Sequence, residues 1–116
     1  GFVWQNAAAF KVTAEIERPL ETADDADREV ARRLPVVTAR LSNTSELPQA
    51  LPILEMKLLD AAGETLAQRV LEPADYGFGG RDAVAPGADV AVRLTVTTPL
   101  PYDASSAVVK AVSALQ

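Results

Sequence analysis

Short stretches of alternating apolar and polar residues, each closed by proline, glycine or a polar turn, constrain the fold of this 116-residue chain most strongly. A period of two places the apolar side chains on one face of a β-strand. Because strands of parallel sheets are buried on both faces and read as continuous apolar runs, alternation favours antiparallel pairing. The stretches that predict strands are residues 10–17, 37–41, 54–58, 65–71, 90–97 and 107–112.

Turn signals separate these stretches every ten residues or so, and this spacing is typical of an all-β protein. We therefore predict an immunoglobulin-like antiparallel β-sandwich of six or seven strands. The length fits one domain, which we expect to span residues 10–116. Residues 1–9 are then an N-terminal flank, which is juxtamembrane if a membrane helix precedes it.

Residues 24–34 are the one candidate helix. Asp24 can cap it, and Arg32 and Arg33 in its last turn would match the helix dipole. A loop between two strands explains the same composition, so helix and loop both stay open. The acidic residues of this segment also suggest calcium, but they lack the glycine and the final glutamate of a calcium loop, which favours a solvated face. These acids are Asp24, Asp25, Asp27 and Glu29.

The composition argues against several classes of function. The chain has no histidine and no cysteine, which removes the best zinc ligands, thiolate chemistry and the usual general base. The net charge of −5 disfavours binding to phosphate backbones and anionic lipids. We therefore expect no enzymatic activity, no metal site, no cofactor and no nucleic-acid partner.

A string of residues in the middle of the chain resembles a known family. The resemblance is to the domain of unknown function 3426, over roughly residues 35–100, and it implies an immunoglobulin-like sandwich without catalytic residues. It also implies the C-terminal, periplasmic part of a bacterial inner-membrane protein, preceded by a cytoplasmic zinc ribbon and one membrane helix. The string comprises Asn43, Leu51-Pro52-Ile53-Leu54-Glu55, Leu58-Leu59-Asp60, Gly63, Ala67-Gln68-Arg69 and Pro73-Ala74-Asp75-Tyr76.

The residues of this string have structural explanations of their own. Asp60 and Gly63 have the chemistry of a tight hairpin turn. Arg69 is expected opposite an acidic residue of the preceding strand, such as Glu55 or Asp60. Asn43-Thr44-Ser45 fits a glycosylation acceptor, but an Asx-turn at a strand end explains it more simply.

The long connection at residues 74–89 contains the candidate binding residues. Phe78 lies between glycines, where it can dock on a partner or fold back over the sandwich. The glycine run lacks the Lys-Ser or Lys-Thr of a phosphate loop. We predict that Tyr76, Phe78 and Arg81 form a partner-binding surface, with the Tyr76 ring turned inward and its hydroxyl bonded. A free edge strand is a second way to bind a partner.

Together these features predict a non-enzymatic protein-interaction domain whose protein partner the sequence does not identify. Two alternatives remain: a small accessory sandwich that binds a small ligand, ion or glycan, and a structural or assembly domain. Contact with a membrane is expected only through a segment preceding Gly1.

Overall fold

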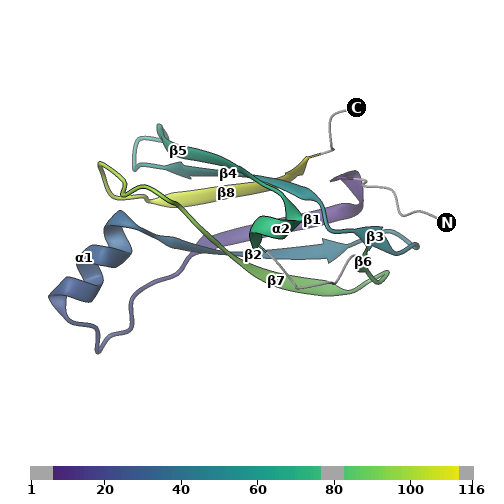
Figure 1. The fold of residues 1–116 in the computed structure, drawn as a ribbon, viewed down its shortest axis with the longest axis horizontal. Helices are drawn as coiled ribbons and strands as arrows, with labels where there is room; N and C mark the ends of the chain where they lie inside the picture. Colours follow the sequence, from purple (N-terminus) through teal and green to yellow (C-terminus); the bar gives the residue numbers. More distant parts are fainter. Residues whose placement is uncertain (1–6, 77–82, 113–116) are drawn as a thin grey trace.

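Six long strands form two three-stranded antiparallel sheets that face each other (Figure 1). The computed structural model describes residues 7–76 and 83–112. Each of the six predicted strands is present, and the predicted antiparallel sandwich is confirmed. The first sheet has the order β1 (Phe10–Ile16), β2 (Val36–Asn43), β7 (Asp89–Thr95), and the second has the order β5 (Thr65–Leu71), β4 (Ile53–Leu59), β8 (Ser106–Val112).

Smaller elements connect the long strands. The described chain begins with a 3-10 turn, η1 (Ala7–Ala9), and a short helix, α2 (Pro73–Tyr76), follows β5. Two strands of two residues each, β3 (Gln49–Ala50) and β6 (Ala83–Val84), pair with each other. Alternation could not predict this pair, because two residues are too few to show a period.

The core lies between the two sheets, where the alternating apolar residues meet. In β2, the central strand of the first sheet, Val37, Ala39 and Leu41 are fully buried. Leu54 and Leu58 of β4, the central strand of the second sheet, are fully buried as well. Burial of these side chains is the main favourable contribution to folding, since the free energy gained scales with the apolar area removed from water.

The hairpin between β4 and β5 forms as the sequence predicts. The Asp60 side chain accepts hydrogen bonds from the backbone N–H groups of Ala62 and Glu64, each at 2.9 Å. Gly63 has a φ of +84°, which an L side chain rarely adopts. The expected partner of Arg69 was wrong. Met56, not an acidic residue, lies opposite Arg69 on β4, and the Arg69 guanidinium donates to the carbonyl of Thr95 in β7, an edge strand of the opposite sheet.

Asn43 ends β2 in the predicted Asx-turn. Its Oδ1 accepts the backbone N–H of Ser45 at 2.9 Å. Its Nδ2 donates to the carbonyls of Leu47 and Val84, both at 2.9 Å. Because the side chain is buried and its amide nitrogen is already bonded twice, the geometry leaves no room for a glycan on this residue.

Residues 25–33 are helical, which decides between the two alternatives for this segment. The helix α1 (Asp25–Arg33) begins after Asp24, whose Oδ1 accepts the backbone N–H of Asp27 at 2.8 Å. Glu29 pairs with Arg32 and, at 3.1 Å, with Arg33. No residue of α1 is buried, so caps and charges rather than core packing hold this helix.

We expect Asp24→Ala to unfold α1 locally while the sandwich stays folded. Loss of an N-cap costs about 1 kcal/mol, and α1 has little packing to offset that loss. Amide hydrogen exchange should accelerate in residues 27–33 and stay unchanged in β2 and β4. Asp24→Asn keeps a capping oxygen and serves as the control, with exchange near that of the parent chain. Equal protection of α1 in the alanine variant would contradict this account of the helix.

The helix α1 and the first described residues lie at opposite ends of the molecule. Figure 1 shows α1 at one end of the long axis and η1 near the other. The molecule extends 51 Å along this axis and only 29 and 20 Å along the other two. The two ends therefore present separate surfaces.

Candidate interaction site

Of the three predicted binding residues, only Tyr76 lies in the described part of the chain. Its ring is buried at the end of α2, and its hydroxyl donates to the carbonyl of Pro52. This confirms the predicted inward ring and bonded hydroxyl. Phe78 and Arg81 lie outside the described residues, so a partner-binding surface formed by Tyr76, Phe78 and Arg81 stays a prediction.

Burial raises the pKa of the Tyr76 hydroxyl above its ordinary value, so the folded state favours the neutral phenol. The stabilisation by the neutral phenol is therefore complete below about pH 10, the pKa of an unfolded tyrosine. It is lost as the pH rises further, because the unfolded state then releases its proton more readily.

We expect the free energy of unfolding to fall by about 1.4 kcal/mol for each pH unit above about pH 10 through Tyr76 alone. Tyr76→Phe should be less stable at neutral pH, since it lacks the hydroxyl bonded to Pro52, but should lose less on alkaline titration. Urea unfolding from pH 7 to 11 measures both effects. Tyr102→Phe, at an exposed tyrosine, is the matched control and should keep the alkaline loss. Identical alkaline slopes for the parent chain and Tyr76→Phe would disprove the assignment.

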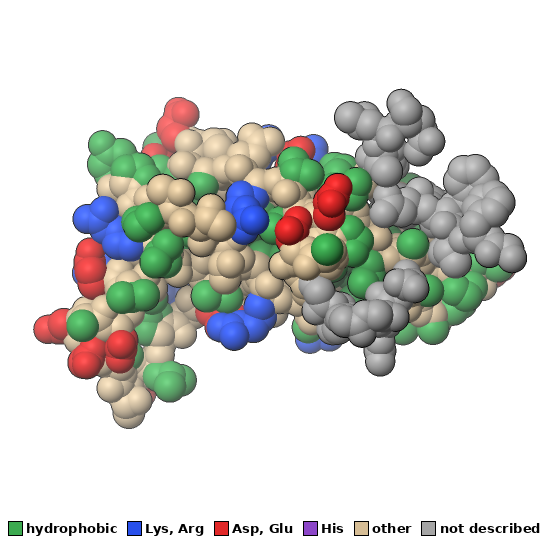
Figure 2. Space-filling model, viewed as in Figure 1, with side chains coloured by type: hydrophobic (Ala, Val, Ile, Leu, Met, Phe, Trp, Pro, Cys, Tyr) green, Lys and Arg blue, Asp and Glu red, His purple; other side chains and the backbone are tan. Residues whose placement is uncertain are grey.

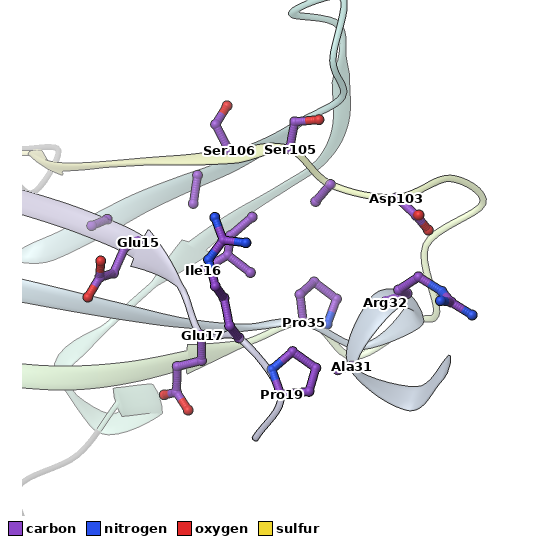
Figure 3. A pocket seen from close by; sticks show the side chains of 14 residues that line it. Glu15, Ile16, Glu17, Pro19, Ala31, Arg32, Pro35, Asp103, Ser105 and Ser106 are labelled. Atoms are coloured by element: carbon purple, nitrogen blue, oxygen red, sulfur yellow. The ribbon is translucent and has the colours of Figure 1, made fainter. Parts of the chain in front are cut away.

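A pocket of about 470 Å³ opens at the α1 end of the sandwich (Figure 3). The end of β1 forms one wall, with Ala14, Ile16 and Arg18. Asp103, Ala104 and Ala107 form the wall at the start of β8, and Ala31 and Arg32 of α1 close the pocket on the third side. The pocket therefore joins segments from both sheets and from the helix.

The charged side chains of this pocket differ in whether they form ion pairs and hydrogen bonds with other residues. Glu17 accepts hydrogen bonds from Arg93 at 2.8 Å and from Thr38 at 2.9 Å. These two bonds, chiefly the one from Arg93, hold the pKa of Glu17 below its usual value. Arg32 is paired with Glu29. Within residues 7–76 and 83–112, Arg18 has neither an ion pair nor a side-chain hydrogen bond. Its guanidinium is therefore available to a ligand.

Exposed apolar side chains gather around the same end. Leu20 is 76% exposed and Tyr102 is 70% exposed, in the connections before α1 and before β8. Val30 of α1 and Leu34 just after it are exposed too. Figure 2 shows hydrophobic side chains interspersed with acidic and basic ones at this end. Such a mixed surface resembles the polar rim and apolar anchors of protein interfaces.

The sequence offered one overlooked signal for this surface. Leu20 follows Pro19, and Tyr102 follows Pro101, so large apolar residues stand in proline-marked connections outside every strand. A connection has no buried face, and such residues stay exposed unless the fold covers them. The sequence does not show that these two connections lie at the same end of the molecule. The end of β1 and the start of β8 come together only in the folded sandwich.

Within residues 7–76 and 83–112, no three acidic side chains come together in an arrangement that could hold a metal ion. The short helices found in these ranges are also not long and apolar enough to cross a membrane.

Comparison with known proteins yields one family. Residues 20–106 match the model of a family described as protein of unknown function, DUF3426. No curated protein and no solved structure matches the chain. The family match includes the segment predicted to carry the resemblance and extends it to α1 and the start of β8. Since the match covers about three quarters of its residues, the chain belongs to the DUF3426 family.

Proposed function

We propose that this chain is a non-enzymatic protein-interaction domain that binds its partner protein with the α1 end of the sandwich. The observation that carries the proposal is the grouping of exposed apolar side chains around a pocket at one end. Of the seven large hydrophobic residues that are exposed in the described chain, Leu20, Val30, Leu34 and Tyr102 belong to this end. Removal of such side chains from water on binding is favourable.

The chemistry of the chain supports binding rather than catalysis. No histidine or cysteine is available as base or nucleophile. In the pocket, the carboxylate of Glu17 is held by Arg93, and Arg32 is held by Glu29, so neither is poised to exchange protons at neutral pH. These arrangements stabilise charges in place, whereas a catalytic acid or base needs a pKa near the working pH.

We further propose the membrane arrangement that the resemblance implies: a cytoplasmic zinc ribbon, one membrane helix preceding Gly1, and this domain on the periplasmic side. Ala7 lies near the end opposite α1, so attachment there would direct the α1 end away from the membrane (Figure 1). Alkaline phosphatase, which needs periplasmic disulfides, tests the topology when fused to the C-terminus of the full-length protein. It should be active there, and an inactive fusion would reject this arrangement.

Photo-crosslinking in the source bacterium tests the interaction proposal. A photoreactive phenylalanine replaces Val30 or Tyr102 at the α1 end, and Leu47 or Val70 as matched exposed positions elsewhere. We expect discrete adducts of one mass from positions 30 and 102 and none from positions 47 and 70. Adducts of equal yield from all four positions, or none from positions 30 and 102, would reject the α1 end as the binding surface.

The pocket also favours a second candidate function, the binding of a small ligand, because about 470 Å³ is within the range of small-molecule sites. A ligand that binds only the folded state adds about 2.7 kcal/mol of stability at a hundredfold excess over its dissociation constant. A thermal-shift screen with glycans tests this candidate, and calcium salts, for which the described residues offer no acidic cluster, serve as the negative control. A shift that Arg18→Gln abolishes would favour it over the protein-interaction proposal.

A further inference from the structure

The two sheets each leave a strand edge open on the same side of the sandwich. β1 is at the edge of the first sheet, and β8 is at the edge of the second. The two strands run alongside each other, yet no ladder of hydrogen bonds joins them in the described structure. Free edges of this kind are templates for pairing with another chain.

The register of β1 shows which of its backbone groups are free. Glu17 donates its backbone N–H to the carbonyl of Val36 in the extension of the β1–β2 pair, at 2.8 Å. Hydrogen-bonding direction alternates along an antiparallel strand, so Ala14 and Ile16 direct their N–H and C=O groups away from β2. Both residues line the pocket, together with Glu15 between them. The pocket wall is therefore an unpaired strand edge.

The side chains around this edge define what could pair with it. Ala14 and Ile16 are half-buried, and Ala104 and Ala107 lie on the opposite wall, so small apolar side chains are available on both walls. Charged and hydroxyl side chains share the lining, among them Glu15, Glu17 and Ser106. Arg18 follows Ile16 by two residues and brings a positive charge that no described residue neutralises. Figure 3 shows the labelled Asp103 near Arg32, on the α1 side of the pocket.

We propose that an extended segment of the partner protein enters this pocket, adds to β1 as a strand through Ala14 and Ile16, and places an acidic side chain on Arg18. The proposal rests on the proposed function and deepens it, since it states the chemistry of the bound segment. Main-chain hydrogen bonds supply affinity in this mode, and alternate side chains supply specificity. Arginine adds a charge-assisted, bidentate contact to a carboxylate.

A library of random ten-residue peptides, displayed between fixed flanks, provides the probe for the 116-residue chain. We expect the recovered peptides to alternate apolar and polar residues and to share an aspartate or glutamate at one position. Arg18→Gln should weaken binding by about tenfold or more, because the charge-assisted hydrogen bonds to the acidic side chain of the peptide are lost. Arg18→Lys should retain part of the affinity. Arg40→Gln, at an exposed arginine of β2, is the matched control and should bind like the parent chain.

N-methylation along one recovered peptide, synthesised with blocked ends, separates strand addition from other binding. Methyl groups at alternate positions should abolish binding, while those between should be tolerated, because only every second N–H of a paired strand faces its neighbour. The amides of Ala14 and Ile16 should become protected from hydrogen exchange in the complex. A uniform methylation profile, recovery of no peptide, or equal binding by Arg18→Gln would overturn the proposal.

Two further outcomes would show which part of the proposal is wrong. Concentration-dependent dimers that protect Ala14 and Ile16 without peptide would make a second copy of this chain the occupant and overturn it. Crosslinks from positions 30 and 102 that persist although no peptide pairs with β1 would overturn strand addition alone. The proposed protein-interaction function would stand in that case.

Discussion

Asn43→Ala is expected to destabilise the fold by about 2–4 kcal/mol, because the lost carboxamide leaves buried backbone groups without partners. The Asn43 side chain is 1% exposed and joins three segments, because Nδ2 donates to Val84 and Leu47 while Oδ1 accepts from Ser45. Truncation removes the side-chain donor of the Val84 carbonyl, and Val84 is a buried residue of β6. An unsatisfied buried carbonyl costs about 1–3 kcal/mol, and the lost Asx-turn adds to this.

Urea unfolding measures this effect as a lower midpoint with an unchanged slope. Ser45→Ala is the matched control. It removes the hydroxyl that donates to Asn43 at 2.7 Å but keeps the backbone N–H that closes the Asx-turn. We expect it to cost about 1 kcal/mol or less, since its group is partly exposed. A loss below about 1 kcal/mol for Asn43→Ala would show that water replaces the carboxamide and that Asn43 does not hold these segments together.

Leu54→Ala is expected to cost about 2–5 kcal/mol through the cavity it leaves in the core. Leu54 lies in β4, the central strand of its sheet, opposite Leu71 on one side and Ala111 on the other, and it is fully buried. A domain of this length has a total stability on the order of 10 kcal/mol. The substitution therefore removes a large fraction of what holds the sandwich together.

Val70→Ala on the neighbouring strand is the matched control, because Val70 is also apolar but is 60% exposed on the outer face. It should change the free energy of unfolding by no more than about 0.5 kcal/mol. Urea unfolding of both variants gives the comparison. Similar losses for Leu54→Ala and Val70→Ala would mean that the core does not lie between the two sheets as described.

The two central strands show why the sequence could predict the core. In β4 every second side chain is apolar and buried, and β2 keeps this pattern up to Leu41, so the period of two in the sequence is also the period of burial. The helix α1 was harder to predict. Its cap at Asp24 and its basic last turn are local signals, but no residue of α1 is buried, and a face packed on the core is the signal that separates helix from loop.

The candidate site was predicted only in part. The inward ring of Tyr76 could be predicted from the local sequence. Pro73 ends the strand before it, and a large aromatic side chain so close to a strand end can pack against the core. The pocket could not be predicted, because its walls come from β1, α1 and the start of β8, which are far apart in the chain. Nothing in the residues around Arg18 indicates that Asp103 and Ala104 lie across from it.

Local sequence is enough to predict where the chain is extended, where it turns and which face of each strand is apolar. These are local properties, set by side-chain alternation and by the backbone preferences of proline, glycine and asparagine. The assembled fold was needed to show which strand edges stay unpaired in the described chain, and that Ala14, Ile16 and Arg18 line a pocket beside β8. Pairing between strands distant in sequence depends on the packing of the whole sandwich, and no short segment carries that information.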